Sequence, residues 1–329
     1  MTAVIEARAL TKRYRSVTAL DAVSFDIEAD TIYAVLGRNG AGKTTAMSLM
    51  TAQNLPSAGT VRVFGEDPYE NARVLSRMCF VREGQKYPDD ATARHALRAA
   101  RLFFPRWDQD FADRLVEDFR LPLKRTIKKL SRGQLSAVGV IIGLASRAEI
   151  TFFDEPYLGL DAVARQLFYD HLLADYAEHP RTVLLSSHLI DEIADLVERV
   201  LVIEEGRILL DATTDETRGL ATSIVGDAEA VASVVAGREV IHRESLGRVT
   251  AATFLGALSP TERRQVAEAG LDLAPVSLQQ LVVRLSQHEA GAGPRARSGA
   301  GPGSDPGPAT DSDAPPAVAG ATDPGRTIR

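Results

Sequence analysis

The chain has 329 residues, 45% hydrophobic and 25% charged, which is ordinary for a globular protein of about two domains. No apolar run approaches the roughly 18 residues needed to cross a bilayer, and residues 1–10 lack a basic segment followed by an apolar core, so we expect a cytoplasmic protein without a secretory signal. The net charge of −6 disfavours nucleic acid as a partner, because binding the phosphate backbone needs a basic face.

Residues 1–212 alternate between predicted strands and helices. An antiparallel β-layer is expected first, formed by Val4–Ala7, Val23–Ile27 and Thr60–Phe64. Three apolar runs then predict strands that are each followed by a helical segment: Thr31–Leu36 before 44–55, Ile150–Phe153 before 162–176, and Thr182–Ser186 before 189–197. This alternation is typical of a parallel sheet with crossover helices. Residues 89–148 are rich in helix formers and predict a helical subdomain.

Residues 213–288 are predicted to form a small C-terminal α/β accessory domain. Strands are expected at Ser223–Val225 and Val249–Phe254, and Ser277–Ser286 begins like a capped amphipathic helix. From Glu289 onward, 15 of the last 41 residues are Gly or Pro and none is aromatic. Such a segment cannot bury enough surface to offset chain entropy, so residues 289–329 are predicted to be a disordered tail.

A glycine-rich turn follows the first predicted parallel strand. Its sequence, Gly37-Arg38-Asn39-Gly40-Ala41-Gly42-Lys43-Thr44, fits the phosphate-binding loop pattern. Glycines let the backbone wrap around a phosphate, and the following helix adds the positive end of its dipole. Lys43 is expected to reach the β- and γ-phosphates, and the Thr44 hydroxyl to bind Mg²⁺. The expected nucleotide contacts are Gly37, Asn39, Gly40, Gly42, Lys43, Thr44 and Thr45.

Two carboxylates end the strand predicted at 150–153. Asp154 and Glu155 would lie at the carboxyl edge of the sheet, where α/β proteins bind ligands. Asp154 is expected to hold the metal, and Glu155 to polarise an attacking water. Taken alone, the pair also fits a strand that simply ends in a polar turn. The single cysteine, Cys79, lies in another apolar run and is predicted to be an inert core residue.

Further motifs, in order along residues 1–212, resemble those of ABC ATPases. Leu130-Ser131-Arg132-Gly133-Gln134 resembles their signature loop, Pro156–Asp161 their D-loop, and Ser186-Ser187-His188 the segment of their switch histidine. Tyr14 stands where the family keeps an aromatic residue that stacks on adenine. The resemblance implies an α/β fold of the P-loop NTPase class, an ABC-type nucleotide-binding domain with an antiparallel β-layer and a helical subdomain. It also implies hydrolysis of ATP with Mg²⁺ as cofactor.

In this family the nucleotide site is shared between two ATPase subunits, so the resemblance implies a homo- or heterodimer. Ser131 and Gly133 would contact the γ-phosphate bound by the partner subunit. His188 would touch the γ-phosphate and support the attacking water, which makes it a candidate catalytic residue together with Glu155 and Lys43. Asp161 would lie at the seam of the dimer and couple the two sites.

The sequence departs from the family pattern at three places. Arg132 replaces a glycine of the signature loop, and Tyr157 stands where a small polar residue is more usual. The family also places a glutamine directly after the strand expected at Met78–Val81, as a ligand of Mg²⁺ and of the attacking water. Here the usual position holds Glu83, and Gln85 follows two residues later. A neutral amide adds no negative charge beside the γ-phosphate, which favours Gln85, whereas strand register favours Glu83.

The resemblance implies integral membrane transporter subunits as partners, docked near the helical subdomain and the loop at 83–85. The protein would then lie on the inner face of the cell membrane. Resemblance to single-domain exporter ATPases with C-terminal extensions favours export. The alternative is a soluble ABC ATPase acting on nucleic acid or the ribosome, although such relatives usually carry two ATPase domains or a long insertion. A P-loop relative without turnover is disfavoured by Lys43 and Glu155.

Overall fold

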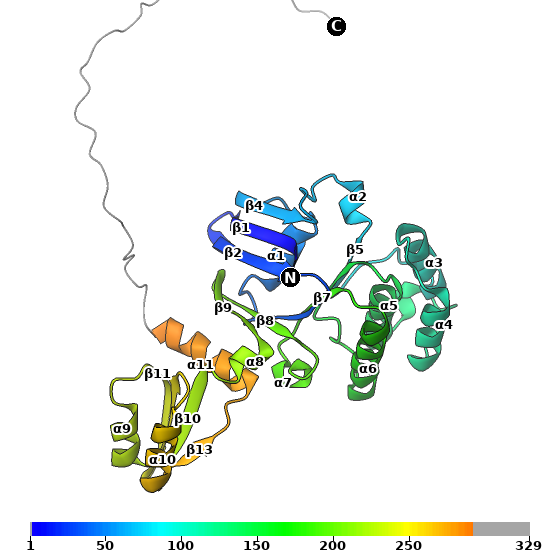
Figure 1. The fold of residues 1–329 in the computed structure, drawn as a ribbon. Helices are drawn as coiled ribbons and strands as arrows, with labels where there is room; N and C mark the ends of the chain where they lie inside the picture. The colour runs from blue at the N-terminus through cyan, green and yellow to red at the C-terminus, as the bar shows by residue number, and fades with distance from the viewer. Residues whose placement is uncertain (1, 292–329) are drawn as a thin grey trace, which may run out of the picture. The chain divides into compact units, whose positions relative to one another are not determined.

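The computed structural model describes residues 2–291, and the side chains of residues 2–288. It is a mixed α/β structure built on three β-sheets, several strands of which are labelled in Figure 1. The greater part of the predicted tail, residues 292–329, lies outside the described residues. Residues 289–291 form the end of helix α11 (Leu278–Gly291), so the boundary predicted at 289 is three residues too early.

A six-stranded sheet forms the centre of residues 2–213. Its order is β5 (Met78–Arg82), β6 (Ile150–Asp154), β7 (Thr182–Ser186), β3 (Ile32–Leu36), β8 (Arg199–Glu204) and β9 (Arg207–Thr213). The first five strands are parallel, and β9 is antiparallel to β8. Every residue of β3, β6 and β7 is buried, which explains why these strands read as continuous apolar runs. The predicted parallel sheet is confirmed, while β8 and β9 were not predicted.

The predicted antiparallel layer is also confirmed, and it covers one face of the central sheet. It consists of β2 (Val17–Glu28), β1 (Ala3–Tyr14) and β4 (Ala58–Val63), in that order. Bulges in the pairing of β1 with β2 interrupt the alternation of apolar residues. The sequence pattern therefore identified only part of each strand, and both strands are longer than predicted. Helix α1 (Lys43–Met50) packs in the same core, where Met47 joins Leu10 of β1 and Phe152 of β6.

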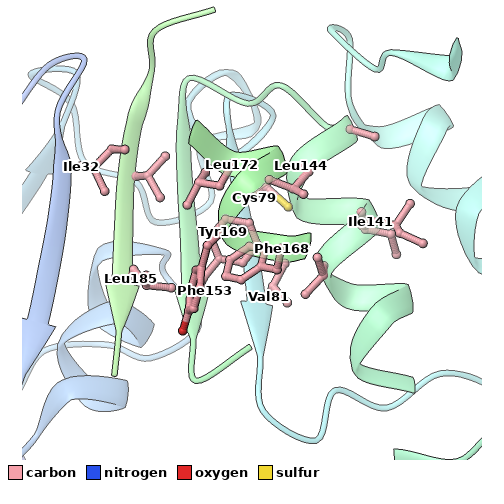
Figure 2. Packing of buried hydrophobic residues seen from close by; sticks show 14 of the residues in the cluster. Ile32, Cys79, Val81, Ile141, Leu144, Phe153, Phe168, Tyr169, Leu172 and Leu185 are labelled. Carbon is pink, nitrogen blue, oxygen red and sulfur yellow. The ribbon is translucent and has the colours of Figure 1, made fainter. Parts of the chain in front are cut away.

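Helices cover the other face of the central sheet. Figure 2 shows Phe153 of β6 beside Phe168 of α6 (Ala162–Glu178), and the two ring centroids are 5.1 Å apart in an edge-to-face arrangement. Cys79 is buried in this core, and burial raises the pKa of its thiol to about 12, as expected of an inert residue. The predicted helical subdomain is confirmed, with α3 (Ala93–Phe103), α4 (Gln109–Asp118), η1 (Ile127–Lys129) and α5 (Arg132–Ala145).

Two predicted helices are shorter than expected. The helix predicted at 44–55 ends at Met50, and the chain then turns at Ala52 with a φ of +54°. The helix predicted at 189–197 is only α7 (Ile190–Ile193). Val197 is still buried beyond its end, so the apolar pattern continues after helical hydrogen bonding has stopped. A further short helix, α2 (Ala72–Leu75), was not predicted.

The C-terminal part has its own antiparallel sheet, in the order β11 (Val240–Leu246), β12 (Val249–Leu255), β10 (Ala221–Asp227) and β13 (Asp272–Ala274). With α9 (Ala228–Val235) and α10 (Pro260–Glu268), the connection β-α-β-β-α-β is the ferredoxin-like arrangement. The strands predicted at 223–225 and 249–254 lie within β10 and β12, whereas β11 and β13 were not predicted. The domain boundary at 212/213 stays a prediction. In the structure β9 ends at Thr213, and the short helix α8 (Thr214–Thr217) connects it to β10.

Close packing between α5 and the sheet gives a first testable prediction. A Cβ added at Gly143 would overlap the ring of Phe153 and lie 2.9 Å from Cγ2 of Val81. Such overpacking costs about 1–3 kcal/mol, against a gain in helix propensity of about 1 kcal/mol. We therefore expect Gly143→Ala to lower the free energy of unfolding by about 1 kcal/mol, measured by urea denaturation.

The matched control is Gly219→Ala, where a Cβ would meet only the Glu216 carbonyl oxygen at 3.8 Å. We expect its free energy of unfolding to change by less than about 0.5 kcal/mol. Equal stabilities of the two variants would contradict the packing argument.

Candidate active site

Four parallel strands end at one edge of the central sheet, and the loops that follow them form a single pocket. The glycine-rich loop follows β3, Asp154 and Glu155 end β6, His188 follows β7, and Glu83 follows β5. The pocket encloses about 400 Å³, a volume in the range of small-molecule sites. It is lined by Asn39, Gly40, Gly42, Lys43, Thr44, Thr45, Glu83, Arg132, Asp154, Glu155, Leu158 and His188.

The glycine-rich loop is held close to its neighbours by backbone contacts. A side chain at Gly37 would overlap the carbonyl oxygen of Ile203 in β8, and a Cβ at Gly42 would lie 2.5 Å from the carbonyl oxygen of Ala19. Gly42 precedes α1 with a φ of +115°, and no side chain among the described residues caps this helix. The first N–H groups of α1 are therefore free to bind an anion.

Lys43 is the buried cation of the pocket, with a side chain that is 6% exposed. Its ammonium group donates to the carbonyl oxygens of Gly37 at 2.8 Å and Arg38 at 3.3 Å. It also lies 3.8 Å from Oε1 of Glu155. The loop thus holds the ammonium beside the uncapped end of α1, where a phosphate would meet both.

Asp154 is buried, and its two carboxylate oxygens accept hydrogen bonds from two hydroxyl groups. Thr44 Oγ1 donates to Oδ2, and Ser186 Oγ donates to Oδ1, each at 2.7 Å. Residues 2–291 contain no group of three or more His, Cys, Asp or Glu side chains that could enclose a metal. A hydroxyl beside one carboxylate nevertheless suits Mg²⁺, which takes few protein ligands and completes its shell with phosphate oxygens and water.

Glu155 lies between Lys43 and His188. Its Oε2 is 3.2 Å from His188 Nδ1, and its backbone N–H donates to Ser186 Oγ at 2.9 Å. The backbone of Glu155 has a φ of +48°, a conformation that costs a non-glycine residue about 1 kcal/mol or more. The buried Ser186 and the adjacent strands hold the carboxylate in place despite this cost.

The loop after β5 places Glu83 and Gln85 differently, and the choice between them stays a prediction. Glu83 lines the pocket, and Gln85 lines instead the apolar groove next to it. Gly84 has a φ of +62°, and Glu83 and Gln85 on either side of it both line a smaller pocket that includes Arg132 and Glu155. Glu83 is paired there with Arg132, whose Nη2 lies 2.9 Å from Oε1 of Glu83. Two departures from the family pattern therefore contact each other.

Six of the predicted site residues do not line this pocket: Tyr14, Gly37, Gln85, Ser131, Gly133 and Asp161. Ser131 caps α5, with its Oγ accepting from the backbone N–H of Gln134 at 3.2 Å, and Asp161 caps α6 in the same way. Tyr14 ends β1, is 41% exposed, and has the Lys12 ammonium 5.0 Å from its ring centroid. Their roles toward a nucleotide stay predictions.

The comparisons with known proteins agree on one family. The family model described as ABC transporter matches residues 20–158. The Nod factor export ATP-binding protein I of Paraburkholderia xenovorans is 32% identical over 211 residues, which are 62% of this chain and 69% of that protein. The chain belongs to the ABC transporter ATP-binding proteins. Members of this family hydrolyse ATP, and this chain is an ABC-type ATPase.

Two further comparisons extend the match. The daunorubicin/doxorubicin resistance ATP-binding protein DrrA of Streptomyces peucetius is 27% identical over 88% of this chain and 94% of its own length, so it also spans the C-terminal part. An ATP-binding cassette solved as a dimer in a post-hydrolysis state with ADP and phosphate matches 64% of this chain and 98% of its own. Its TM-score is 0.57 at 19% identity, which shows the ABC ATPase fold.

Sequence reasoning missed three residues of the site. Ser186 could have been found from topology, because it pairs with Asp154 across the parallel strands β6 and β7. Arg132 and Tyr157 were noticed only as departures from the family pattern. Their partners, Glu83 and His188, are 49 and 31 residues away in sequence, and a single sequence does not connect them.

The position of Glu83 gives a second prediction. Because Glu83 lines the pocket, Glu83→Ala should change the turnover of Mg-ATP several-fold, whereas Gln85→Ala should stay within about twofold of the wild type. The measurement is steady-state phosphate release by the two single variants at saturating Mg-ATP. A larger effect of Gln85→Ala would return the role to the glutamine.

Proposed function

We propose that this ABC ATPase binds Mg-ATP in the pocket at the carboxyl edge of the sheet and drives export through separate membrane subunits. One observation carries the proposal: Lys43 and the uncapped start of α1 share one pocket with Asp154, Glu155 and His188. The first two suit phosphate binding, and the other three suit hydrolysis.

The proposed roles follow from the contacts. The Lys43 ammonium would exchange its two carbonyl partners for the β- and γ-phosphates. Thr44 and Asp154 would hold Mg²⁺, which when bound offsets the negative charge of the phosphates. Glu155 would accept a proton from the attacking water, and His188 would support the γ-phosphate beside it.

A third prediction tests these roles. Glu155→Gln keeps the size of the side chain but removes the base, so phosphate release should fall by two orders of magnitude or more while ATP still binds. Lys43→Ala should instead lose nucleotide affinity. The measurements are steady-state phosphate release and equilibrium binding of a fluorescent ATP analogue.

On gel filtration with ATP, Glu155→Gln should run as a dimer and Lys43→Ala as a monomer. A Glu155→Gln variant that retains wild-type turnover would remove Glu155 from the catalytic role and leave the binding roles open.

A second ATPase subunit would complete the site. Ser131 caps α5 outside the pocket of its own chain, so its hydroxyl and the start of that helix would face the nucleotide of a partner. The solved cassette with this fold is described as dimeric. Asp161, at the start of α6, would lie near the same seam.

The membrane partner would dock on an apolar groove beside the pocket. The groove encloses about 440 Å³ and is lined by residues of the loop after β5 and of α3, among them Gln85, Tyr87, Ala96 and Phe103. At the end of α3, Leu102 is 86% exposed and Phe103 72% exposed. Among the described residues no helix is both long and apolar enough to cross a bilayer. An apolar segment of a membrane subunit on the cytoplasmic side would fit this groove.

A fourth prediction tests the docking site. Leu102→Asp with Phe103→Asp should abolish copurification with a membrane subunit, because two charges would enter an apolar contact. Basal phosphate release should be unchanged. Leu246→Asp, at a residue 85% exposed in the C-terminal sheet, is the matched control and should still copurify. Loss of the partner with the control alone would move the docking site to that sheet.

Export is favoured by the names of the relatives, one an export protein and one a drug-resistance protein. Neither name points to nucleic acid or to the ribosome, so the soluble alternative gains no support. Uptake of a labelled substrate into inverted vesicles that contain both subunits would test the direction, since an exporter accumulates substrate inside them only when ATP is outside.

A further inference from the structure

We propose that Tyr157 is a positioning residue for His188, and that its hydroxyl keeps the proton of the imidazole on Nε2. The inference rests on the proposed function, in which His188 acts at the γ-phosphate. Tyr157 stands where the family more usually has a small polar residue.

Tyr157 is 2% exposed, and its side chain contacts His188. Its hydroxyl oxygen is 3.1 Å from His188 Nδ1 and accepts the backbone N–H of His188 at 3.0 Å. The two ring centroids are 5.5 Å apart. One hydroxyl group therefore fixes both the backbone and the ring of the histidine.

The Tyr157 hydroxyl is a hydrogen-bond donor at neutral pH. Burial raises the pKa of Tyr157 to about 12, so the phenol keeps its proton. The hydroxyl oxygen accepts the His188 backbone N–H, and the group still has its own proton to donate. His188 Nδ1 is an acceptor within hydrogen-bond distance of this proton, and the Ser187 side chain is a second hydrogen-bonding neighbour.

His188 Nδ1 faces two different neighbours. The Tyr157 hydroxyl can donate to it, whereas the ionised Glu155 carboxylate, 3.2 Å away, can only accept from it. When Nδ1 carries the proton, it donates to Oε2 of Glu155 and occupies the oxygen that should receive the proton of water. When Nδ1 accepts from Tyr157, the proton lies on Nε2, and that carboxylate oxygen is free.

Tyr157 thus favours the Nε2–H tautomer of His188, which would support catalysis in two ways. An N–H on Nε2 can donate to a phosphate oxygen in the pocket that His188 lines. The Glu155 carboxylate then has no imidazole proton to bind and remains a base. Without the hydroxyl, the contact with Glu155 would determine the tautomer.

The test is Tyr157→Phe, which keeps the ring and removes the hydroxyl. We expect kcat to fall about tenfold and KM for ATP to stay within about twofold, since the lost hydrogen bond orients the histidine and does not bind nucleotide. The tautomer is measured by NMR on protein with ¹⁵N-labelled histidine, and the signal of His188 is assigned by its loss in His188→Ala. It should change from Nε2–H in the wild type toward Nδ1–H in the variant.

The matched control is Tyr169→Phe. Tyr169 is 4% exposed, and its hydroxyl has no hydrogen-bond partner within the part of the chain that the structure describes. This variant should keep the wild-type kcat and the wild-type tautomer. Equal losses in both variants would show a general effect of removing a buried hydroxyl and would overturn the inference.

The outcomes separate the inference from the proposed function. If His188→Ala is slow and Tyr157→Phe has the wild-type rate and tautomer, the positioning role is wrong while the proposed function stands. If His188→Ala has the wild-type rate, the role of His188 is wrong and the inference falls with it. An Nδ1–H tautomer in the wild-type protein overturns the inference without any variant.

Discussion

The buried carboxylate of Asp154 connects the parts of the molecule on which hydrolysis depends. It accepts one hydroxyl from α1, through Thr44, and another from β7, through Ser186. Burying a carboxylate away from water costs free energy unless its oxygens accept hydrogen bonds. The burial of Asp154 therefore requires both hydroxyls, and with them the placement of α1 and β7 next to β6. The same Ser186 oxygen accepts the Glu155 N–H, and the next residue in the site is thereby fixed as well.

The departures of this chain from the family pattern are matched by contacts. Arg132 in the signature loop is paired with Glu83, which occupies the usual place of a glutamine. Tyr157, in place of a small polar residue, holds His188. Each unusual residue meets a residue that lines the pocket, so the changes act on the site itself and not on a distant surface.

Much of the site could be predicted because it depends on local patterns. In a parallel sheet the carboxyl ends of the strands lie along one edge. A glycine-rich turn after one strand therefore comes close to the acids that end another. The choice between Glu83 and Gln85 depends on the path of one loop, which the residues at 83–85 do not encode locally. In the C-terminal sheet, β11 contains His242, Arg243 and Glu244 and so lacks an apolar pattern, and β13 has only three residues.

Helix α11 packs on both parts of the chain. Val282 is buried in the core that contains Phe153 and Ile141, while Leu281 is buried with Ile241 of the C-terminal sheet. Ser286 also donates to Glu204 at the end of β8. A shortened chain ending at residue 212 would therefore expose to water the apolar side chains that Val282 now covers.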